Sequence, residues 1–258
     1  MIQSLRSLLN PQAFSWIPHK TPLSAPVTLA CATVGYLVSV AFLSWSCRKP
    51  VPVPKLVAPA HNLFLCLLSL VMFAGTLKEV IQETATQGSR EWLFCMPKET
   101  RVQGAVFYWS YIYYLSKYWE FVDTFLLVLK AKPLSFLHVF HHAVVPTMAF
   151  LWLEAAQSLQ HLALLTNSGV HVLMYLYYFL CSIGIYPGWK QLITQCQIVQ
   201  FVFSFSTLLP FAYYQVSKPQ GCAGAGALLF NGIFNLLLLI LFIQFSSRTY
   251  KSKQRKTT

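Results

Sequence analysis

The sequence predicts an all-α integral membrane protein with about seven transmembrane helices. Of its 258 residues, 56% are apolar and only 10% are charged. An ordinary soluble domain carries roughly 25% charged residues, so this composition excludes that class. Aromatic residues make up 16% of the chain, which excludes intrinsic disorder.

Seven segments contain the runs of roughly 20 predominantly apolar residues that cross a bilayer as a helix. Proline-rich or polar turns separate several of them, and no soluble domain intervenes. We therefore expect a single polytopic membrane domain over residues 1–258, ending in a basic tail over 246–258. The predicted spans are 26–47, 60–77, 105–129, 134–153, 158–181, 191–214 and 223–245.

The distribution of charge predicts the orientation of these spans. Lys and Arg total 19 against 7 Asp and Glu, a formal net charge of +12. So few charges on so apolar a chain do not indicate a nucleic-acid partner. Basic residues concentrate on the cytosolic side of membranes, which predicts a cytosolic carboxyl tail. The same side then holds basic but no acidic residues in its loops, namely Arg48, Lys49, Lys55, Lys130, Lys132 and Lys190.

Two cysteines stand apart from the other five. Cys95 and Cys222 are the ones that fall in predicted non-cytosolic loops, before the third and seventh spans. An organelle lumen is oxidising enough to keep a disulfide. We therefore predict a bond between them.

The third span contains charged residues, which are costly in a bilayer and usually line a cavity. Lys117, Glu120, Asp123 and Thr124 share one helical face. A buried ion pair that positions helices would explain part of this face. A polar wall of an active site would explain all of it, and the two interpretations are compatible.

The fourth span carries three histidines, His138, His141 and His142. Positions i, i+3 and i+4 lie on one face, and three imidazoles in an apolar span are difficult to explain structurally. Two chemical interpretations compete. The imidazoles bind a metal, or one acts as nucleophile or base while its neighbours orient it.

Polar stripes also follow one face of the fifth and sixth spans. Together they predict a wall of hydrogen-bonding groups, although amides in a membrane also bridge helices. The fifth span contributes Asn167, His171, Met174, Tyr175 and Tyr178, and the sixth contributes Thr194, Gln197 and Gln200.

The seven histidines leave the metal interpretation open. His138, His141, His142 and His171 are grouped, fewer than the ligands of membrane di-iron desaturases. They would suffice for one zinc, but Glu120 and Asp123 would then need another purpose. A metal-dependent membrane oxidase or desaturase remains an alternative, as does a seven-span receptor or transporter.

These residues resemble the ELO family of very-long-chain fatty-acid elongases, the membrane 3-oxoacyl-CoA synthases. Four family motifs occur in order. Residues 117–124 match KxxExxDT, 138–142 match HxxHH, 171–178 match HxxMYxYY and 194–200 match TxxQxxQ. The resemblance implies condensation of a long-chain acyl-CoA with malonyl-CoA, giving a 3-oxoacyl-CoA, CoA and carbon dioxide. It also implies that the spans enclose an acyl-chain tunnel.

The resemblance and the chemistry together suggest roles for the site residues. His141 would attack the thioester and carry an acyl-imidazole, and His171 would stabilise the oxyanion. No metal, NAD or flavin is then required. Orienting or supporting roles fall to His138, His142, Asp123, Glu120, Lys117, Thr124, Asn167, Met174, Tyr175, Tyr178, Thr194, Gln197 and Gln200.

The family resemblance further implies a setting in the endoplasmic reticulum membrane, among lipid and the other enzymes of the elongation cycle, with a homodimer as one assembly. Residues 255–258 resemble a dilysine retrieval signal in which Arg replaces one lysine. The stretch 130–138 resembles plant and algal members of the family, which is compatible with a polyunsaturated acyl substrate.

Overall fold

The computed structural model describes residues 10–251, and all regular structure in this range is helical apart from two isolated bridges. The tail residues 252–258, with the expected retrieval signal, lie outside the described residues. Three short segments, η1 (Pro11–Ala13), η2 (Glu91–Leu93) and η3 (Ser247–Lys251), accompany the main helices. The main helices are α2 (Pro26–Ser46), α3 (Val57–Gln87), α4 (Ala105–Trp119), α5 (Phe121–Leu129), α6 (Phe136–Glu154), α7 (Gln160–Ser182), α8 (Lys190–Ser206), α9 (Leu208–Ser217) and α10 (Ala225–Ser246).

Six helices in the described range are long and apolar enough to cross a membrane, with α8 and α9 counted together. Helices α4 and α5 follow one another with only Glu120 between them and together cover the third predicted span, 105–129. The all-helical architecture confirms the predicted fold class. The chain is therefore an all-α integral membrane protein.

The second crossing is longer than the predicted segment 60–77, because α3 continues to Gln87. Lys78, Glu79 and Glu83, which follow the predicted span, are therefore part of α3. No Gly or Pro interrupts this polar stretch, so the helix continues until Gly88, whose left-handed φ of 61° ends it. Predicting spans from hydropathy alone cannot detect such an extension.

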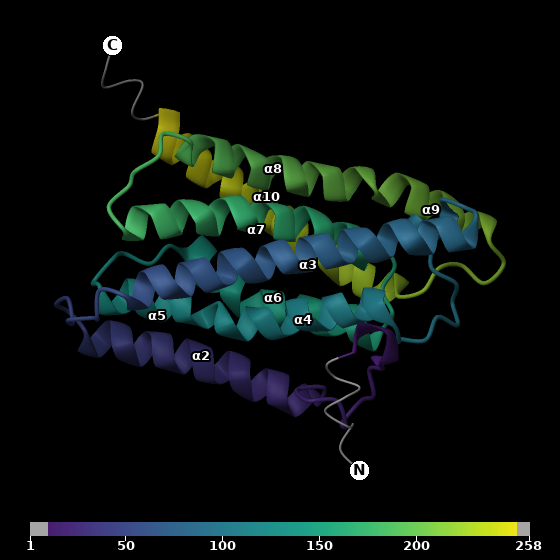
Figure 1. The fold of residues 1–258 in the computed structure, drawn as a ribbon, viewed down its shortest axis with the longest axis horizontal. Coiled ribbons are helices and arrows are strands. Elements are labelled where there is room, and N and C mark those ends of the chain that lie inside the picture. The colour runs from purple at the N-terminus through teal and green to yellow at the C-terminus, as the bar shows by residue number, and fades with distance from the viewer. Residues whose placement is uncertain (1–9, 252–258) are drawn as a thin grey trace.

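The helices lie roughly side by side along the long axis of the molecule (Figure 1). Packing contacts run from α3 to α4, then to α6, α10, α8, α7 and back to α3, so these helices form a closed ring. Helix α2 packs outside the ring, against α5 and α6, at the lower edge of Figure 1. The ring creates the interior in which polar side chains avoid lipid.

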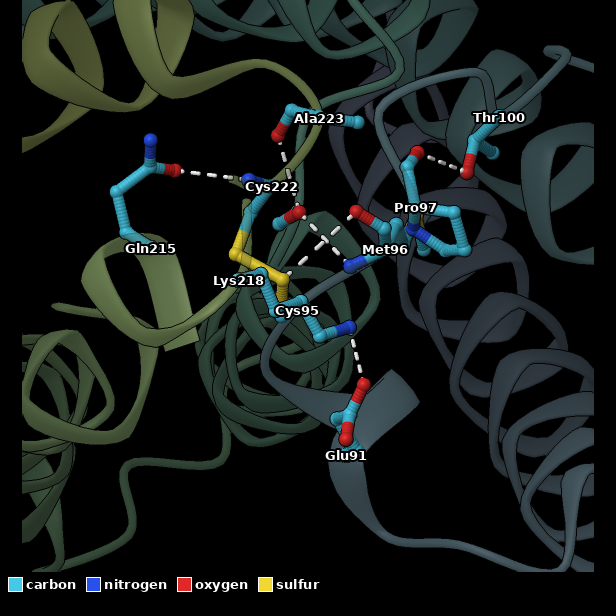
Figure 2. Close-up of a disulfide and its surroundings, with 10 residues drawn as sticks. Glu91, Cys95, Met96, Pro97, Thr100, Gln215, Lys218, Cys222 and Ala223 are labelled. Atoms are coloured by element: carbon cyan, nitrogen blue, oxygen red, sulfur yellow. Dashed lines mark hydrogen bonds and ion pairs between the residues drawn. A yellow bond between two sulfur atoms is a disulfide. The ribbon is translucent and has the colours of Figure 1, made fainter. Parts of the chain in front are cut away.

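A disulfide joins two loops at the end of the bundle where α3 ends and α10 begins. The Sγ atoms of Cys95 and Cys222 are bonded, 127 residues apart in sequence. Figure 2 shows hydrogen bonds around the disulfide, including one from the Cys95 amide to the Glu91 carbonyl. The Ala223 amide also donates a bond of 2.9 Å to the Met96 carbonyl. Ser158 ties in the α6–α7 loop, because its hydroxyl accepts from the Met96 amide and donates to the Ala223 carbonyl.

The amino-terminal segment packs against the same end of the bundle. Phe14 stacks on Tyr111 with ring centroids 5.1 Å apart. The Trp16 indole donates a hydrogen bond of 3.0 Å to Glu154 at the end of α6. Three loops and the amino-terminal segment thus pack together over this end of the ring.

Candidate active site

A cavity of about 440 Å³ lies inside the helix ring, lined from α3, α5, α6, α7, α8 and α10. All four sequence motifs contribute to its wall, so the structure brings together segments separated by up to 80 residues. The wall contains Glu120, Asp123, His138, His141, His142, Asn167, His171, Met174, Tyr175, Tyr178, Thr194, Gln197 and Gln200. Two predicted site residues, Lys117 and Thr124, are not part of the lining and lie behind it.

Lys117 and Glu120 form a buried ion pair where α4 meets α5. The distance from Nζ to Oε1 is 2.5 Å, and each side chain is only 2% exposed. The Lys117 ammonium also lies 4.0 Å from the centre of the Tyr113 ring. The same Glu120 oxygen is 3.6 Å from Nδ1 of His171 on α7. The pair therefore joins helices and, through Glu120, also reaches the cavity.

Asp123 receives hydrogen bonds from two other helices. Its Oδ1 lies 2.8 Å from Nε2 of His61 on α3, and its Oδ2 accepts a bond of 2.7 Å from the Tyr175 hydroxyl on α7. Tyr175 in turn packs edge-on against His171. His61 was not predicted as part of this site, because local spacing contains no information about a partner 62 residues away.

Thr124 positions the first histidine of the HxxHH motif. Its hydroxyl lies 2.9 Å from Nε2 of His138 and 3.0 Å from the Tyr36 hydroxyl on α2. Ser135 begins α6 as its N-cap, with its side chain accepting from the His138 amide. Sequence reasoning missed Tyr36. A tyrosine within an apolar span was the available signal, but alone it is not specific.

His141 and His142 follow one turn further along α6. The ring of His142 lies between those of His138 and His141, with centroids 4.5 Å and 5.3 Å away. Nδ1 of His141 is buried and has no hydrogen-bond partner among the described residues. Pro146 has no amide hydrogen, so the carbonyl of His142 lacks the usual helical hydrogen bond. A polar backbone atom is thus freed beside the imidazoles.

The amides on α7 and α8 complete the wall. Tyr113 donates a hydrogen bond of 2.9 Å to Asn167, which fixes that side chain from α4. The amide of Gln197 lies 3.7 Å from the Met174 sulfur, a contact between α8 and α7. Bridging of helices and lining of the cavity, the two alternatives considered for these amides, therefore occur together.

The imidazoles and carboxylates pair with one another rather than converging on a point. Within residues 10–251, no group of three or more His, Cys, Asp or Glu side chains is arranged to hold a metal ion. His138 contacts a hydroxyl, and His61 and His171 contact carboxylates.

The cavity has two chemically different ends. Lys130, Ser135 and Lys190 line it where α5 ends and α8 begins. In the other direction, His141 also lines a second cavity of about 30 Å³ between α4, α6, α7, α8 and α10. A third cavity of about 20 Å³ follows, sharing Asn231 with the second.

Comparison with known proteins identifies the family of this chain. The model of the family described as ELO: GNS1/SUR4 matches residues 21–258. The chain belongs to the ELO family. A putative fatty acid elongase of Dictyostelium discoideum is 36% identical over 250 residues, covering 95% of this chain and 83% of that protein.

Two further ELO relatives extend the comparison. Fatty acid elongase A of Dictyostelium discoideum is 36% identical, with 93% of this chain and 89% of that protein covered. Very long chain fatty acid elongase 2 of Mus musculus is 34% identical over 87% of this chain and 76% of its own length. The family resemblance predicted from the four motifs is confirmed. In this ELO protein the motifs lie on α4–α5, α6, α7 and α8, around one cavity.

Proposed function

We propose that this ELO protein is a very-long-chain 3-oxoacyl-CoA synthase that condenses a long-chain acyl-CoA with malonyl-CoA. The observation that carries the proposal is the position of His141. Its ring lines the cavity beside His142, its Nδ1 has no hydrogen-bond partner within residues 10–251, and His171 lines the same cavity from α7. A neutral imidazole is a competent nucleophile toward a thioester.

In the first half-reaction, a ring nitrogen of His141 attacks the thioester carbonyl. The carbon–nitrogen bond forms as the carbon–sulfur bond breaks, and CoA leaves as its thiol with the proton released by the imidazole. The product is an acyl-imidazole. His171, next to Glu120, is positioned to donate a hydrogen bond to the carbonyl oxygen as its negative charge develops.

In the second half-reaction, malonyl-CoA loses its carboxylate as carbon dioxide and becomes an enolate. The enolate carbon attacks the acyl carbon, the new carbon–carbon bond forms, and the carbon–nitrogen bond to His141 breaks. The 3-oxoacyl-CoA leaves, and the departing imidazole nitrogen takes up a proton from solvent, which returns His141 to its starting state. Atoms and electrons balance without a metal or a redox cofactor.

The ends of the cavity support an orientation for the substrates. Lys130 and Lys190 provide positive charge for the phosphates of CoA, and the acyl tail would extend toward the smaller cavities. We propose that the lysine end faces the cytosol, together with the carboxyl tail, and that the protein is in the endoplasmic reticulum membrane. Membrane lipid, the other enzymes of the elongation cycle and a second copy of the chain are the proposed partners, and a polyunsaturated acyl chain is the proposed tail.

The experiment is an incorporation assay on microsomes from a host without competing elongase. With acyl-CoA and malonyl-CoA labelled at its central carbon, we expect label in a chain-extended 3-oxo product. His141→Ala should abolish incorporation, whereas His19→Ala, which changes an exposed histidine far from the cavity, should retain it. Full activity of His141→Ala would remove the nucleophile assignment.

Two further measurements address the mechanism. Acyl-CoA alone should add one acyl mass to the peptide that contains His141, because the first half-reaction needs no malonyl-CoA. Metal analysis of the purified, active protein distinguishes the alternative chemistry. Stoichiometric iron that is needed for activity would favour a histidine-box oxidase and overturn the proposed reaction.

A further inference from the structure

The two small cavities beyond His141, called the channel below, are more polar than a path for a saturated hydrocarbon needs to be. The cavity of about 30 Å³ has hydrophobic and aromatic walls, including Trp152, Phe201 and Phe234. Five uncharged polar side chains interrupt these walls, namely Asn167, Gln200, Ser204, Asn231 and Asn235. Three of them, Ser204, Asn231 and Asn235, also line the cavity of about 20 Å³ that follows.

Asn231 is the most unusual of these side chains. It lies on α10, is only 4% exposed, and its Oδ1 has no hydrogen-bond partner among the described residues. Leaving a buried acceptor unpaired is unfavourable, so such atoms call for a specific explanation. A leucine at this position would pack against the same neighbours without that cost. The position of the amide on the channel wall suggests that it meets a ligand.

We infer that Asn231, together with Ser204 and Asn235, selects acyl chains that carry cis double bonds in their carboxyl-proximal half. This inference rests on the proposed condensing function and deepens it. It assigns to these residues a preference for polyunsaturated over saturated acyl-CoA. They are specificity-determining residues and take no part in bond formation.

The chemistry of the channel matches such a chain. The C–H groups of a cis diene are better donors to an amide oxygen than saturated methylenes, and its π electrons accept weak hydrogen bonds from an amide N–H. Water occupying a polar cavity of this size must leave when the chain enters, and a saturated chain cannot replace any of its hydrogen bonds. Several polar groups lie along the channel wall, and a polyunsaturated chain carries several double bonds. Such a wall therefore fits this chain better than it fits an acyl chain with one isolated hydroxyl group.

The position of the selected double bond follows from α10. His141, the proposed attachment point of the acyl group, has its ring centroid 6.5 Å from that of Phe234. Asn231 precedes Phe234 by three residues, which is roughly 4.5 Å along a helix. The amide therefore lies close to the reacting carbon, and the chain passes it within its first several carbons. Double bonds near the methyl end would not reach it.

Three eighteen-carbon acyl-CoA substrates test the inference in one competition assay. One is saturated, and the other two are isomeric cis trienes, of which one has its first double bond three carbons nearer the carboxyl group. The parent protein should prefer the carboxyl-proximal triene by kcat/KM. In Asn231→Leu this preference should fall at least fivefold, mainly because the saturated chain reacts better. Ser204→Ala should shift the preference in the same direction by a smaller factor.

Gln244→Leu is the matched control, since it makes the same kind of change at an exposed position of α10 outside these cavities. Its substrate ratios should equal those of the parent. Unchanged ratios in both Asn231→Leu and Ser204→Ala, or an equal loss for all three substrates, would overturn the inference. If the parent extends none of the substrates while the membrane fraction contains folded protein, the proposed function itself fails. Failure of the inference therefore leaves an active protein, whereas failure of the proposed function leaves no activity with any of the substrates.

Discussion

Breaking the Lys117–Glu120 pair should destabilise the protein more than any surface change. Both side chains are 2% exposed, and the two charged atoms are 2.5 Å apart. Lys117→Met keeps most of the side-chain volume but leaves the Glu120 carboxylate buried without its cation, with the His171 imidazole 3.6 Å away. Removing one member of a buried pair typically costs about 3–5 kcal/mol, chiefly because the remaining charge is uncompensated.

This cost converts into a measurable shift in unfolding temperature. A chain of this size changes its Tm by roughly 2–4 °C per kcal/mol, so Lys117→Met should unfold roughly 6–20 °C below the parent in the same detergent. The double variant Lys117→Met with Glu120→Gln removes both charges and should recover most of the loss. Its proposed condensing activity should stay low, because the contact of Glu120 with His171 is then also weakened.

The assay is thermal unfolding of the detergent-purified protein, followed by tryptophan fluorescence, for the parent, both single variants and the double variant. Elongase activity is measured on the same preparations. A double variant no more stable than Lys117→Met would refute the argument from uncompensated charge. Full activity in the stable double variant would instead assign the pair a purely structural role.

Three other perturbations have expected results. His61→Leu should lower kcat on the order of 10²-fold by freeing the Asp123 carboxylate, whereas His61→Gln, which can still donate to it, should recover part of the activity; equal losses in both would contradict a positioning role. Replacing Cys95 and Cys222 by Ser should cost about 2–5 kcal/mol of stability, and a reducing agent should then have no further effect on Tm. Gly224→Ala should destabilise by at least about 1–3 kcal/mol, as seen in its Tm, because φ is +71° and the new methyl group would collide with the α6–α7 backbone.

Much of the fold could be predicted because its signals are local. Apolar runs identified the crossings, and helical periodicity placed Glu120 and Asp123 on one face before any partner was known. The closed order of the ring could not be predicted in this way, since helix faces of similar hydropathy do not reveal their neighbours. The interruption at Glu120 was also missed, because no Pro or Gly indicates it in the sequence.

The identities of most site residues could be predicted from the sequence, but the hydrogen bonds between them could not. The motifs indicated which side chains face the interior, and the structure groups most of them around one cavity. The bonds from His61 to Asp123 and from Tyr36 to Thr124 join residues 62 and 88 positions apart. Such pairs depend on how whole helices pack, which a single sequence does not record. Asn231 was not predicted as a site residue for the same reason, because its place beside the cavities depends on how α10 packs.

The pairing of the intramembrane charges has a consequence for biosynthesis. Lys117 neutralises Glu120 within one helical turn, and Asp123 finds His61 on a helix that emerges from the ribosome earlier. Tyr175 follows Asp123 by 52 residues, which is roughly 3–10 s of translation at ordinary rates. Each charge therefore has a partner before α7 exists, and the nascent chain can release this segment into lipid without waiting for the helices that complete the site.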